Sequence, residues 1–385
     1  MPEVLLNDTN KDLKAALNAE KLASIELEER TFAQRQKSSM FQQVQAELSR
    51  YLKLQHLSPV RDIILVGEGP AVEDIYMTCR GDENKTLRFR GCFNDTEISG
   101  VMNDKVLGNV EEAKRFAIEN KIDEIYCALP GTEKRKIMDL MQFAENNTIR
   151  FRLIPSPESY IPSIEVSSLE FIGGVPTSKV RKEPLEKPIS RVVKRAFDVV
   201  FSAFVIMFVF TWLFPLLAIL VKLSSPGPVF FKQIRGGKDN DEFVCWKFRS
   251  MKVSPVDDSK QASKNDPRVT LIGKFLRKTN LDEMPQFFNV LFGQMSVVGP
   301  RPHPVKLTDQ YRDIIDKYMV RHFVTPGVTG WAQVNGYRGE TRVPELMEKR
   351  VEFDVWYLEN WSFWLDLRIV VMTFTRMLKN DPNAY

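Results

Sequence analysis

Residues 199–221, VVFSAFVIMFVFTWLFPLLAILV, form a long uncharged segment near the middle of a chain of 385 residues. A helix needs about 20 apolar residues to cross a bilayer, so this run is long enough. It lies too far from the N-terminus to be a signal peptide. The run predicts a membrane segment, and it divides the chain into two parts of different character.

Two features of this segment argue against a simple transmembrane helix. Pro215 lies inside the run, where proline removes a helical hydrogen bond and kinks the helix. Both flanks are basic, which favours the cytosol for both ends. We therefore expect a re-entrant hairpin broken at Pro215, with a kinked transmembrane span or a buried core helix as alternatives. The basic flanking residues are Lys194, Arg195, Lys222, Lys232, Arg235 and Lys238.

The overall composition limits the classes of partner. The formal net charge of +4 is too small to indicate nucleic acid, and the cationic residues around the apolar run suit an anionic membrane surface instead. The four cysteines are scattered without metal-ligand spacing, which favours reduced thiols on the cytosolic side. The three histidines form no HExxH pattern, so we expect no zinc site.

The part of the chain before the apolar run alternates strand and helix patterns. Apolar runs at 63–66, 89–93, 125–129 and 150–154 predict strands, and 111–120 and 133–146 predict helices. This alternation indicates a parallel sheet in a Rossmann-like α/β domain over residues 59–155.

A glycine motif follows the first of these predicted strands. Gly67 and Gly69 fit the start of a G-x-G-x-x-G fingerprint, but Val72 occupies the place of the third glycine. The evidence for a bound dinucleotide is therefore weak, and a structural or sensing domain is the alternative.

Two less regular segments flank this domain. Residues 1–58 are polar, and apolar residues recur at helical spacing between Phe41 and Leu52, which predicts a helix for packing or self-association. Residues 156–190 contain several prolines and are basic near their end. We expect them to form a linker leading to the membrane segment, placed at 191–223.

Candidate catalytic residues lie in the remaining segment, 224–385. Asp282 and Glu283 are adjacent, Arg277 lies five residues before them, and Arg301 follows in a Gly-Pro-Arg-Pro loop. Apolar spacing predicts an amphipathic helix that begins near Asp282. Thr279 or Asn280 would cap this helix and Gly293 would end it.

An acid pair at a helix start suits phosphate chemistry. The helix dipole stabilises anions there, and the carboxylates would attract Mg²⁺. The metal, Arg277 and Arg301 could then neutralise a pyrophosphate, while one carboxylate attacks phosphorus to give a covalent acyl phosphate. The alternative is that adjacent acids only complement the dipole. The second arginine and the membrane segment favour catalysis on a lipid phosphate.

From Lys194 to the C-terminus the chain resembles the bacterial sugar transferases, the monotopic polyprenyl-phosphate hexose-1-phosphate transferases. The resemblance covers roughly half the chain and passes through many motifs in order. They are Lys194-Arg-Ala-Phe-Asp198, Ser225-Pro-Gly-Pro-Val-Phe-Phe-Lys-Gln233, Lys247-Phe-Arg-Ser-Met251, Asn265-Asp-Pro-Arg-Val-Thr270, Leu281-Asp-Glu-Met-Pro-Gln286, Asn289-Val-Leu-Phe-Gly-Gln-Met-Ser-Val-Val-Gly-Pro-Arg-Pro302 and Pro326-Gly-Val-Thr-Gly-Trp-Ala-Gln-Val-Asn-Gly336.

The resemblance implies a reaction. A hexose 1-phosphate passes from a UDP-sugar of the glucose or galactose type to undecaprenyl phosphate, and UMP is released. By position, Asp282 would be the nucleophile and bind Mg²⁺, and Glu283 would be its acid–base partner. Arg277 and Arg301 would hold phosphates. The loop 299–304 looks like that of members using UDP-glucose.

The resemblance also implies a location. Lys194 and Arg195 would lie at the membrane surface, and Pro215 would break the re-entrant helix. The catalytic domain would be a mostly α, membrane-associated (α+β) unit at the cytoplasmic face of the bacterial inner membrane. Residues 59–155 would match the nucleotide-fold domain that precedes it in larger members. A homodimer is compatible with the additional domain.

Two departures from the larger members are visible. Those members usually begin with several transmembrane helices, and we expect none here before Val199. The loop Arg235–Glu242 contains Gly236 and Gly237 but lacks the second glycine of the family's pattern, while the acid pair and both arginines are intact.

Two other functions compete with the transferase hypothesis. One is a non-catalytic nucleotide-sensing membrane protein with an assembly or regulatory role. The other is a metal-dependent phosphatase or pyrophosphatase at the membrane, in which water would be the acceptor.

Overall fold

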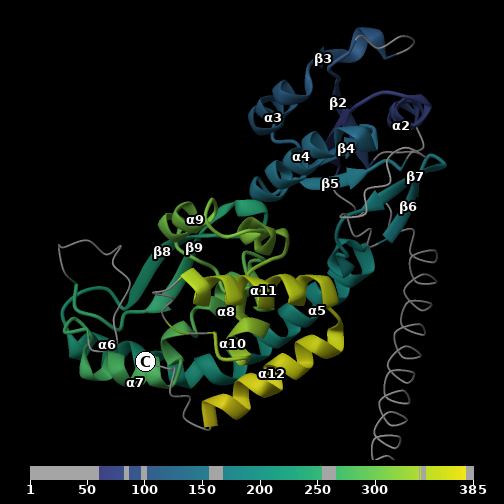
Figure 1. The fold of residues 1–385 in the computed structure, drawn as a ribbon. Helices are drawn as coiled ribbons and strands as arrows, with labels where there is room; N and C mark the ends of the chain where they lie inside the picture. The colour runs from purple at the N-terminus through teal and green to yellow at the C-terminus, as the bar shows by residue number, and fades with distance from the viewer. Residues whose placement is uncertain are drawn as a thin grey trace, which may run out of the picture. The chain divides into compact units, whose positions relative to one another are not determined.

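The protein is represented by a computed structural model that describes residues 60–81, 86–96, 102–155, 168–253, 266–337, 339 and 344–378 (Figure 1). The helix predicted between Phe41 and Leu52 lies outside the described residues. Residues 58–385 form one compact unit.

The described residues in the first part of that unit form a twisted sheet with the strand order β3-β2-β1-β4-β5-β7-β6. Strands β1 to β5 pair in parallel, as predicted, and the Rossmann-like arrangement is confirmed. The strands are β1 Arg61–Val66, β2 Leu87–Phe93, β3 Val106–Gly108, β4 Glu124–Cys127, β5 Arg150–Leu153, β6 Ser168–Ile172 and β7 Val175–Lys179, and the helices are α2 Pro70–Arg80, α3 Val110–Glu119 and α4 Lys134–Asn146.

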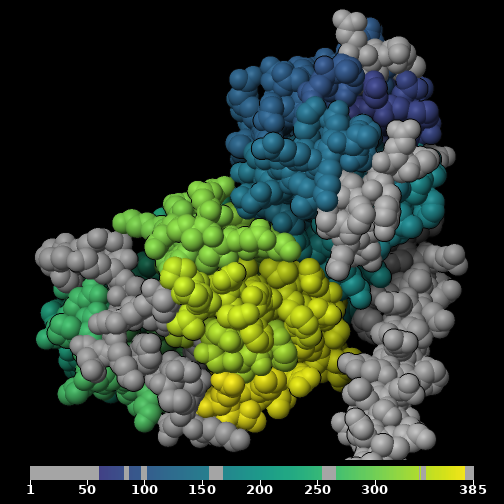
Figure 2. Space-filling model, viewed as in Figure 1, coloured from purple at the N-terminus to yellow at the C-terminus, as the bar shows by residue number. Residues whose placement is uncertain are grey.

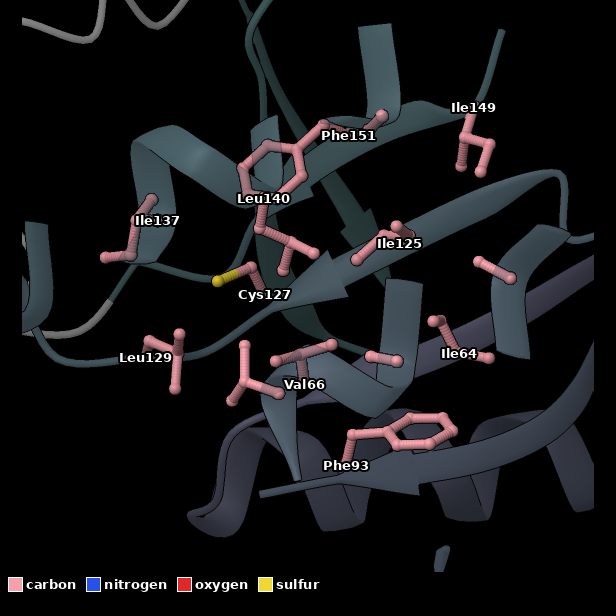
Figure 3. Close-up of a cluster of buried hydrophobic side chains, with 14 of the residues drawn as sticks. Ile64, Val66, Phe93, Ile125, Cys127, Leu129, Ile137, Leu140, Ile149 and Phe151 are labelled. Atoms are coloured by element: carbon pink, nitrogen blue, oxygen red, sulfur yellow. The ribbon is translucent and has the colours of Figure 1, made fainter. Parts of the chain in front are cut away.

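Both faces of the parallel sheet are buried. Because successive strand residues point to opposite faces, Ile64 and Val66 of β1 lie on one side and Ile63 and Leu65 on the other. The first pair packs with α3 and α4 in the cluster of Figure 3, and the second pair packs with α2. Burial on both faces explains why these strands are continuous apolar runs.

The segment 156–190 is not an irregular linker throughout. Strands β6 and β7 form a hairpin, and β7 pairs antiparallel with β5, so the sheet extends beyond residue 155. Gly173 and Gly174 form its two-residue turn with φ values of 55° and 87°, the left-handed conformation that such hairpins require. The prolines of this segment predict a linker. The Gly-Gly pair, which is typical of a two-residue hairpin turn, is the stronger local signal.

The apolar run forms helices α5, Pro188–Val205, and α6, Thr211–Ser224, joined by a π-helical turn, Ile206–Phe210. In the described part of the chain this is the one helix long and apolar enough to cross a membrane, by length and composition. Pro215 lies inside α6 without ending it. Two side chains of α6 donate hydrogen bonds to carbonyls of this π-helical turn. Thr211 Oγ1 donates to Met207 O and Trp212 Nε1 donates to Phe208 O, each at a distance of 3.0 Å.

One side of this helix carries an exposed apolar stripe. Its members recur at spacings of three and four residues, the repeat of a single helical face. The opposite side packs on the C-terminal half of the chain, where the ring centroids of Phe214 and Phe248 lie 4.9 Å apart. The exposed stripe consists of Val200, Phe204, Met207, Phe208, Trp212, Leu216, Ile219 and Leu223.

The rest of the unit is mostly helical and contains one long hairpin, in agreement with the predicted α-rich second half. In Figure 2 the C-terminal helices, in yellow, lie at the surface. Helix α12 has a buried side and an exposed side, because Ile369 lies in the core while Trp364 and Phe374 are exposed. The elements are β8 Phe230–Gly236, β9 Glu242–Phe248, α7 Leu271–Lys278, α8 Gln286–Leu291, β10 Ser296–Val298, α9 Val305–Tyr311, β11 Gly327–Thr329, α10 Trp331–Val334, α11 Pro344–Asn360 and α12 Phe363–Leu378.

Candidate active site

The acid pair lies in a single 3-10 turn, η7 Leu281–Glu283, and not at the start of a long helix. The predicted cap is wrong, because Thr279 Oγ1 bonds back to Phe275 O at the end of α7. Asn280 instead turns the chain with φ 59°, a left-handed conformation that asparagine tolerates. Helix α8 then begins at Gln286, and Gly293, with φ 85°, follows its end, close to the predicted position.

Asp282 is a buried carboxylate without a direct partner. It is 8% exposed, and no described residue makes a hydrogen bond or ion pair with its side chain. Burial, together with the neighbouring Glu283 charge, raises the pKa of Asp282 to about 6. Lys247, Arg277 and Arg301 oppose this shift by favouring the charged form.

Glu283 has the opposite environment. Its Oε1 accepts from Lys247 Nζ at 2.7 Å and from Arg301 Nη2 at 2.5 Å, and its Oε2 accepts from Arg301 Nη1 at 3.1 Å. The two neighbouring acids therefore differ in whether their carboxylate oxygens are already bonded to cations. Glu283 is tied into a bidentate ion pair, whereas the oxygens of Asp282 have free lone pairs.

Lys247 is a site residue that the sequence analysis did not select. It lies on β9, and burial lowers the pKa of its ammonium group, while Glu283 opposes that change. A lysine within the apolar run Phe243–Phe248 was the available signal. Its partner lies 36 residues further along the chain, so local spacing could not reveal the ion pair.

Arg277 reaches the site through a close helix contact. Thr270 Oγ1 caps α7 by accepting from Gly273 N at 2.9 Å. Gly273 lies against Ser250 O, where a β-carbon would overlap the carbonyl. This approach lets Arg277, one turn later, donate from Nε to Ser250 Oγ at 2.8 Å. From there its positive charge favours the ionised form of Asp282.

The loop that carries Arg301 is held by an unbroken series of hydrogen bonds. The backbone carbonyls of residues 300 to 303 each accept a hydrogen bond from a donor outside the loop, at distances of 2.7 to 3.1 Å. Such a loop is preorganised to present a cation at a fixed place. The donors, in order, are Gly327 N, Arg321 Nη2, Arg235 Nη1 and Gly236 N.

Buried charges support this loop from behind. Arg321 forms an ion pair with Asp354 at 2.7 Å, and His303 Nδ1 lies 2.6 Å from the Tyr318 hydroxyl. Burial and the nearby Arg321 hold the pKa of His303 well below its usual range, so the imidazole is neutral. Arg235, predicted as a basic flank of the membrane segment, is likewise buried as a support of the loop.

Lys194, expected at a membrane surface, is buried inside the protein. Its side chain is buried and donates to Asp366 Oδ2 at 2.8 Å, Val298 O at 2.9 Å and Tyr357 Oη at 3.2 Å. A buried lysine requires such partners, and the nearest carboxylate lies 172 residues away in sequence. The structure therefore makes Lys194 a tether between α5, β10 and α12.

Arg195 and Pro215 are also separate from the acid pair. The half-buried Arg195 donates to Val290 O at 2.6 Å and Leu291 O at 2.7 Å, which caps the C-terminal end of α8. Pro215 is exposed on α6. The predicted residues that the structure brings together are Asp282, Glu283, Arg277 and Arg301, now joined by Lys247.

The predicted magnesium ligand can be tested against the donor set. Within the described ranges no group of three or more His, Cys, Asp or Glu side chains is arranged to hold a metal ion. Lys247 and Arg301 occupy the oxygens of Glu283, which leaves Asp282 as the available carboxylate. One carboxylate together with substrate phosphates is a common way to bind Mg²⁺, so the residues fit.

Comparisons with known proteins agree with the two-part organisation. Residues 189–380 match the family model of bacterial sugar transferases, and residues 38–155 match that of a CoA-binding domain. UDP-glucose:undecaprenyl-phosphate glucose-1-phosphate transferase of Escherichia coli K12 is 45% identical over 284 residues, 74% of this chain and 60% of the relative. This chain thus spans about 60% of that relative's length.

Two further relatives differ from each other in the sugar donor that their names give. A UDP-glucose:undecaprenyl-phosphate glucose-1-phosphate transferase of Caulobacter vibrioides is 43% identical over 203 residues, 52% of this chain and 75% of the relative. A UDP-N-acetylgalactosamine-undecaprenyl-phosphate N-acetylgalactosaminephosphotransferase of Aeromonas hydrophila is 43% identical over 196 residues, 50% of this chain and 45% of the relative.

Proposed function

Because the chain belongs to the bacterial sugar transferase family, we propose that it transfers a hexose 1-phosphate from a UDP-sugar to undecaprenyl phosphate and releases UMP. The observation that carries this proposal is the buried Asp282 carboxylate, which lacks a direct partner among the described residues and lies among three cations. A carboxylate with free lone pairs beside positive charge is equipped to attack a phosphate.

The proposed reaction has two displacements at one phosphorus atom. An Asp282 oxygen attacks the sugar-bearing phosphorus of the UDP-sugar, the bond to the bridging oxygen breaks, and UMP leaves. A phosphate oxygen of undecaprenyl phosphate then attacks the same phosphorus and breaks its bond to Asp282. The lipid diphosphate sugar departs, and the carboxylate is regenerated.

Three cations would stabilise the charge that develops on the phosphates. Arg301 is fixed by its loop, Arg277 is aligned by Ser250, and Lys247 balances Glu283. Preorganised donors in a site of low dielectric contribute more than they would in water. We assign Glu283 as the acid–base partner of Asp282, since the adjacent positions place it at the reacting centre.

Asp282 would also hold Mg²⁺ together with the diphosphate of the donor. When bound, the metal would supply charge neutralisation of the phosphate oxygens.

The donor is proposed to be of the glucose or galactose type. Names of relatives at similar identity include both glucose and N-acetylgalactosamine, so overall similarity alone does not select the sugar. His303 is buried behind the catalytic loop, and its place in the sequence motif is therefore a structural feature of the loop.

We further propose that α5 and α6 form a re-entrant segment at the cytoplasmic face of the inner membrane. Both flanks are basic, and one helix face is exposed and apolar. The other face packs on residues of the C-terminal half as far as Val221, which favours entry and exit at the same membrane face.

Release of UMP from a panel of UDP-sugars, with purified protein, Mg²⁺ and undecaprenyl phosphate, tests this function. We expect repeated turnover with one class of sugar, dependent on the lipid. Without the lipid, UMP release beyond one equivalent per protein would instead indicate hydrolysis to water. Absence of release with every donor, in a folded protein, would contradict the transferase assignment.

A further inference from the structure

A cavity of about 450 Å³ lies apart from the acid pair and its cations, none of which lines it. It is bounded by the first residues of β1 and β5, by the turn η4 Pro184–Glu186, by the first half of α5 and by the β8–β9 turn. Its volume falls within the range of small-molecule sites, roughly 300–1,000 Å³.

Almost all of the basic residues that line this cavity are already satisfied. Arg191, on the first turn of α5, is the exception: no described residue bonds its guanidinium, and its Nη2 is buried. The satisfied cations and their partners are Arg61 with Glu124 and Glu186, Arg150 with Glu183, Lys194 with Asp366, Arg195 with the carbonyls of Val290 and Leu291, and Lys238 with Asp239.

The charges around Arg191 make an unpaired guanidinium unfavourable. Arg61 and Arg150 repel it, and Glu186 is the nearby opposing charge. Glu186 is already committed, however, because it pairs with Arg61, Arg152 and Lys179. Native proteins seldom leave a buried donor without a partner, so the Arg191 guanidinium is available to bond an oxygen of a ligand.

We propose that this cavity binds a small phosphorylated anion through the guanidinium of Arg191. Arginine presents a planar fork of donors that matches phosphate oxygens, and Arg61 and Arg150 would add positive charge. Leu185, Phe323 and Leu358 form an apolar part of the lining. That lining suits the organic portion of a phosphate monoester better than inorganic phosphate alone.

The site is physically connected to the catalytic loop. Arg191 lies one helical turn before Lys194, whose Nζ donates to Val298 O at 2.9 Å. Val298 ends β10, and the loop with Arg301 begins at the next residue. An anion that orders the first turn of α5 would therefore stabilise the support of the Arg301 loop, and it would act as a regulator.

Calorimetric titration of the full chain in detergent tests the site. The background is Arg301→Gln, which weakens anion binding at the acid pair. The probes are inorganic phosphate, AMP and phosphatidylglycerol dissolved in micelles of the same detergent. We expect saturable binding of at least one probe and a dissociation constant at least about tenfold larger when Arg191→Gln is added. Lys238→Gln, an exposed cation of the same lining, should leave binding unchanged.

The three probes separate the sources of the phosphate group, and a preference for any one supports the site. Arg191→Gln removes an unpaired, partly buried cation, so its thermal unfolding midpoint without probe should equal or exceed that of the parent. An unchanged dissociation constant in this folded variant would overturn the proposal, as would the absence of saturable binding by all three probes. Neither readout depends on UMP release.

Discussion

At the scale of single residues, the site separates two neighbouring carboxylates by environment. Glu283 is bound by Lys247 and Arg301, whereas Asp282 is buried beside these charges without touching them. Pairs of acids that differ in this way commonly divide the chemical work between them. In the proposed mechanism the nucleophile is the acid that keeps its lone pairs free, which here is Asp282.

The first prediction concerns Asp282→Asn. The change keeps the shape of the side chain and removes the nucleophile, so UMP release should fall by at least about 10³-fold. It also removes a buried charge, so the thermal unfolding midpoint should stay the same or rise. Activity close to wild type would exclude Asp282 as the nucleophile. A large fall in the midpoint would show that its charge is structural.

The second prediction concerns pH. The pKa of Asp282 is raised to about 6, so its carboxyl is protonated below that pH and cannot attack. We expect kcat/KM of the free enzyme to fall roughly tenfold per pH unit below about 6. A profile that remains flat to about pH 4.5, measured on protein shown to stay folded, would contradict this environment for Asp282.

The third prediction concerns Lys247→Met. Lys247 favours the charged form of Asp282, so its loss should move the acid limb of the pH profile to higher pH. It should also lower kcat by about 10²-fold or more, because one preorganised charge is lost. The matched control is Lys252→Met, which changes an exposed lysine shortly after the end of β9. An unmoved acid limb would assign Lys247 a purely structural role.

At the scale of elements, helix α7 and the Arg301 loop bring arginines to the acid pair from two directions. Helix α7 depends on the close approach of Gly273 to Ser250, and the loop depends on four donors to consecutive carbonyls. Both devices fix the backbone, and the backbone in turn positions the guanidinium groups.

The fourth prediction concerns Gly273→Ala. The added methyl group would meet Ser250 O and push α7 outwards, so Arg277 should lose its bond to Ser250. We expect a loss of stability of about 1–3 kcal/mol from overpacking and a raised KM for the UDP-sugar. Denaturant unfolding and steady-state kinetics measure both effects. Lys274→Ala, at the neighbouring exposed position, should change neither, and equal behaviour of the two variants would refute the contact.

Local patterns predicted the elements whose signals are local. Strand β1 and helices α3 and α4 follow from apolar spacing within single segments, because each buries its own face in the core. The hairpin β6–β7 was missed because prolines obscured its Gly173-Gly174 turn.

The sequence predicts the site to a similar extent, because only its local motifs are visible in the sequence. The acid pair and both arginines belong to short motifs, whereas the supporting ion pairs join distant positions. Lys194 was expected at the membrane because its run of neighbours is basic, yet its partner Asp366 lies on the last described helix. Arg321 and Arg235 meet the loop through folding alone, and spacing carries no signal for such contacts.

At the scale of the whole molecule, the described residues form a sheet domain, an apolar helix and a unit that carries the acid pair. The apolar helix is attached along its length to catalytic elements, through Lys194 to β10, through Arg195 to α8 and through Phe214 to β9. A membrane segment attached in this way would hold the acid pair beside the bilayer, where a lipid phosphate is presented.

The fifth prediction concerns the topology of that segment. Single cysteines at the exposed positions Lys187 and Lys222 flank the apolar run in a variant without the native cysteines. For a re-entrant hairpin, an impermeant maleimide added to intact cells should label neither position, and lysis should expose both. Labelling of one end in intact cells would establish a transmembrane span.

The central claim is that the sugar phosphate passes through Asp282, and the mass of the intact protein tests it most directly. The purified chain is incubated with Mg²⁺ and its UDP-sugar donor in the absence of undecaprenyl phosphate. We predict a mass increase equal to one hexose phosphate, located on Asp282, with stoichiometric UMP, and its loss when the lipid is added. UMP release during lipid-dependent turnover without any adduct, or an adduct that persists in Asp282→Asn, would contradict the account.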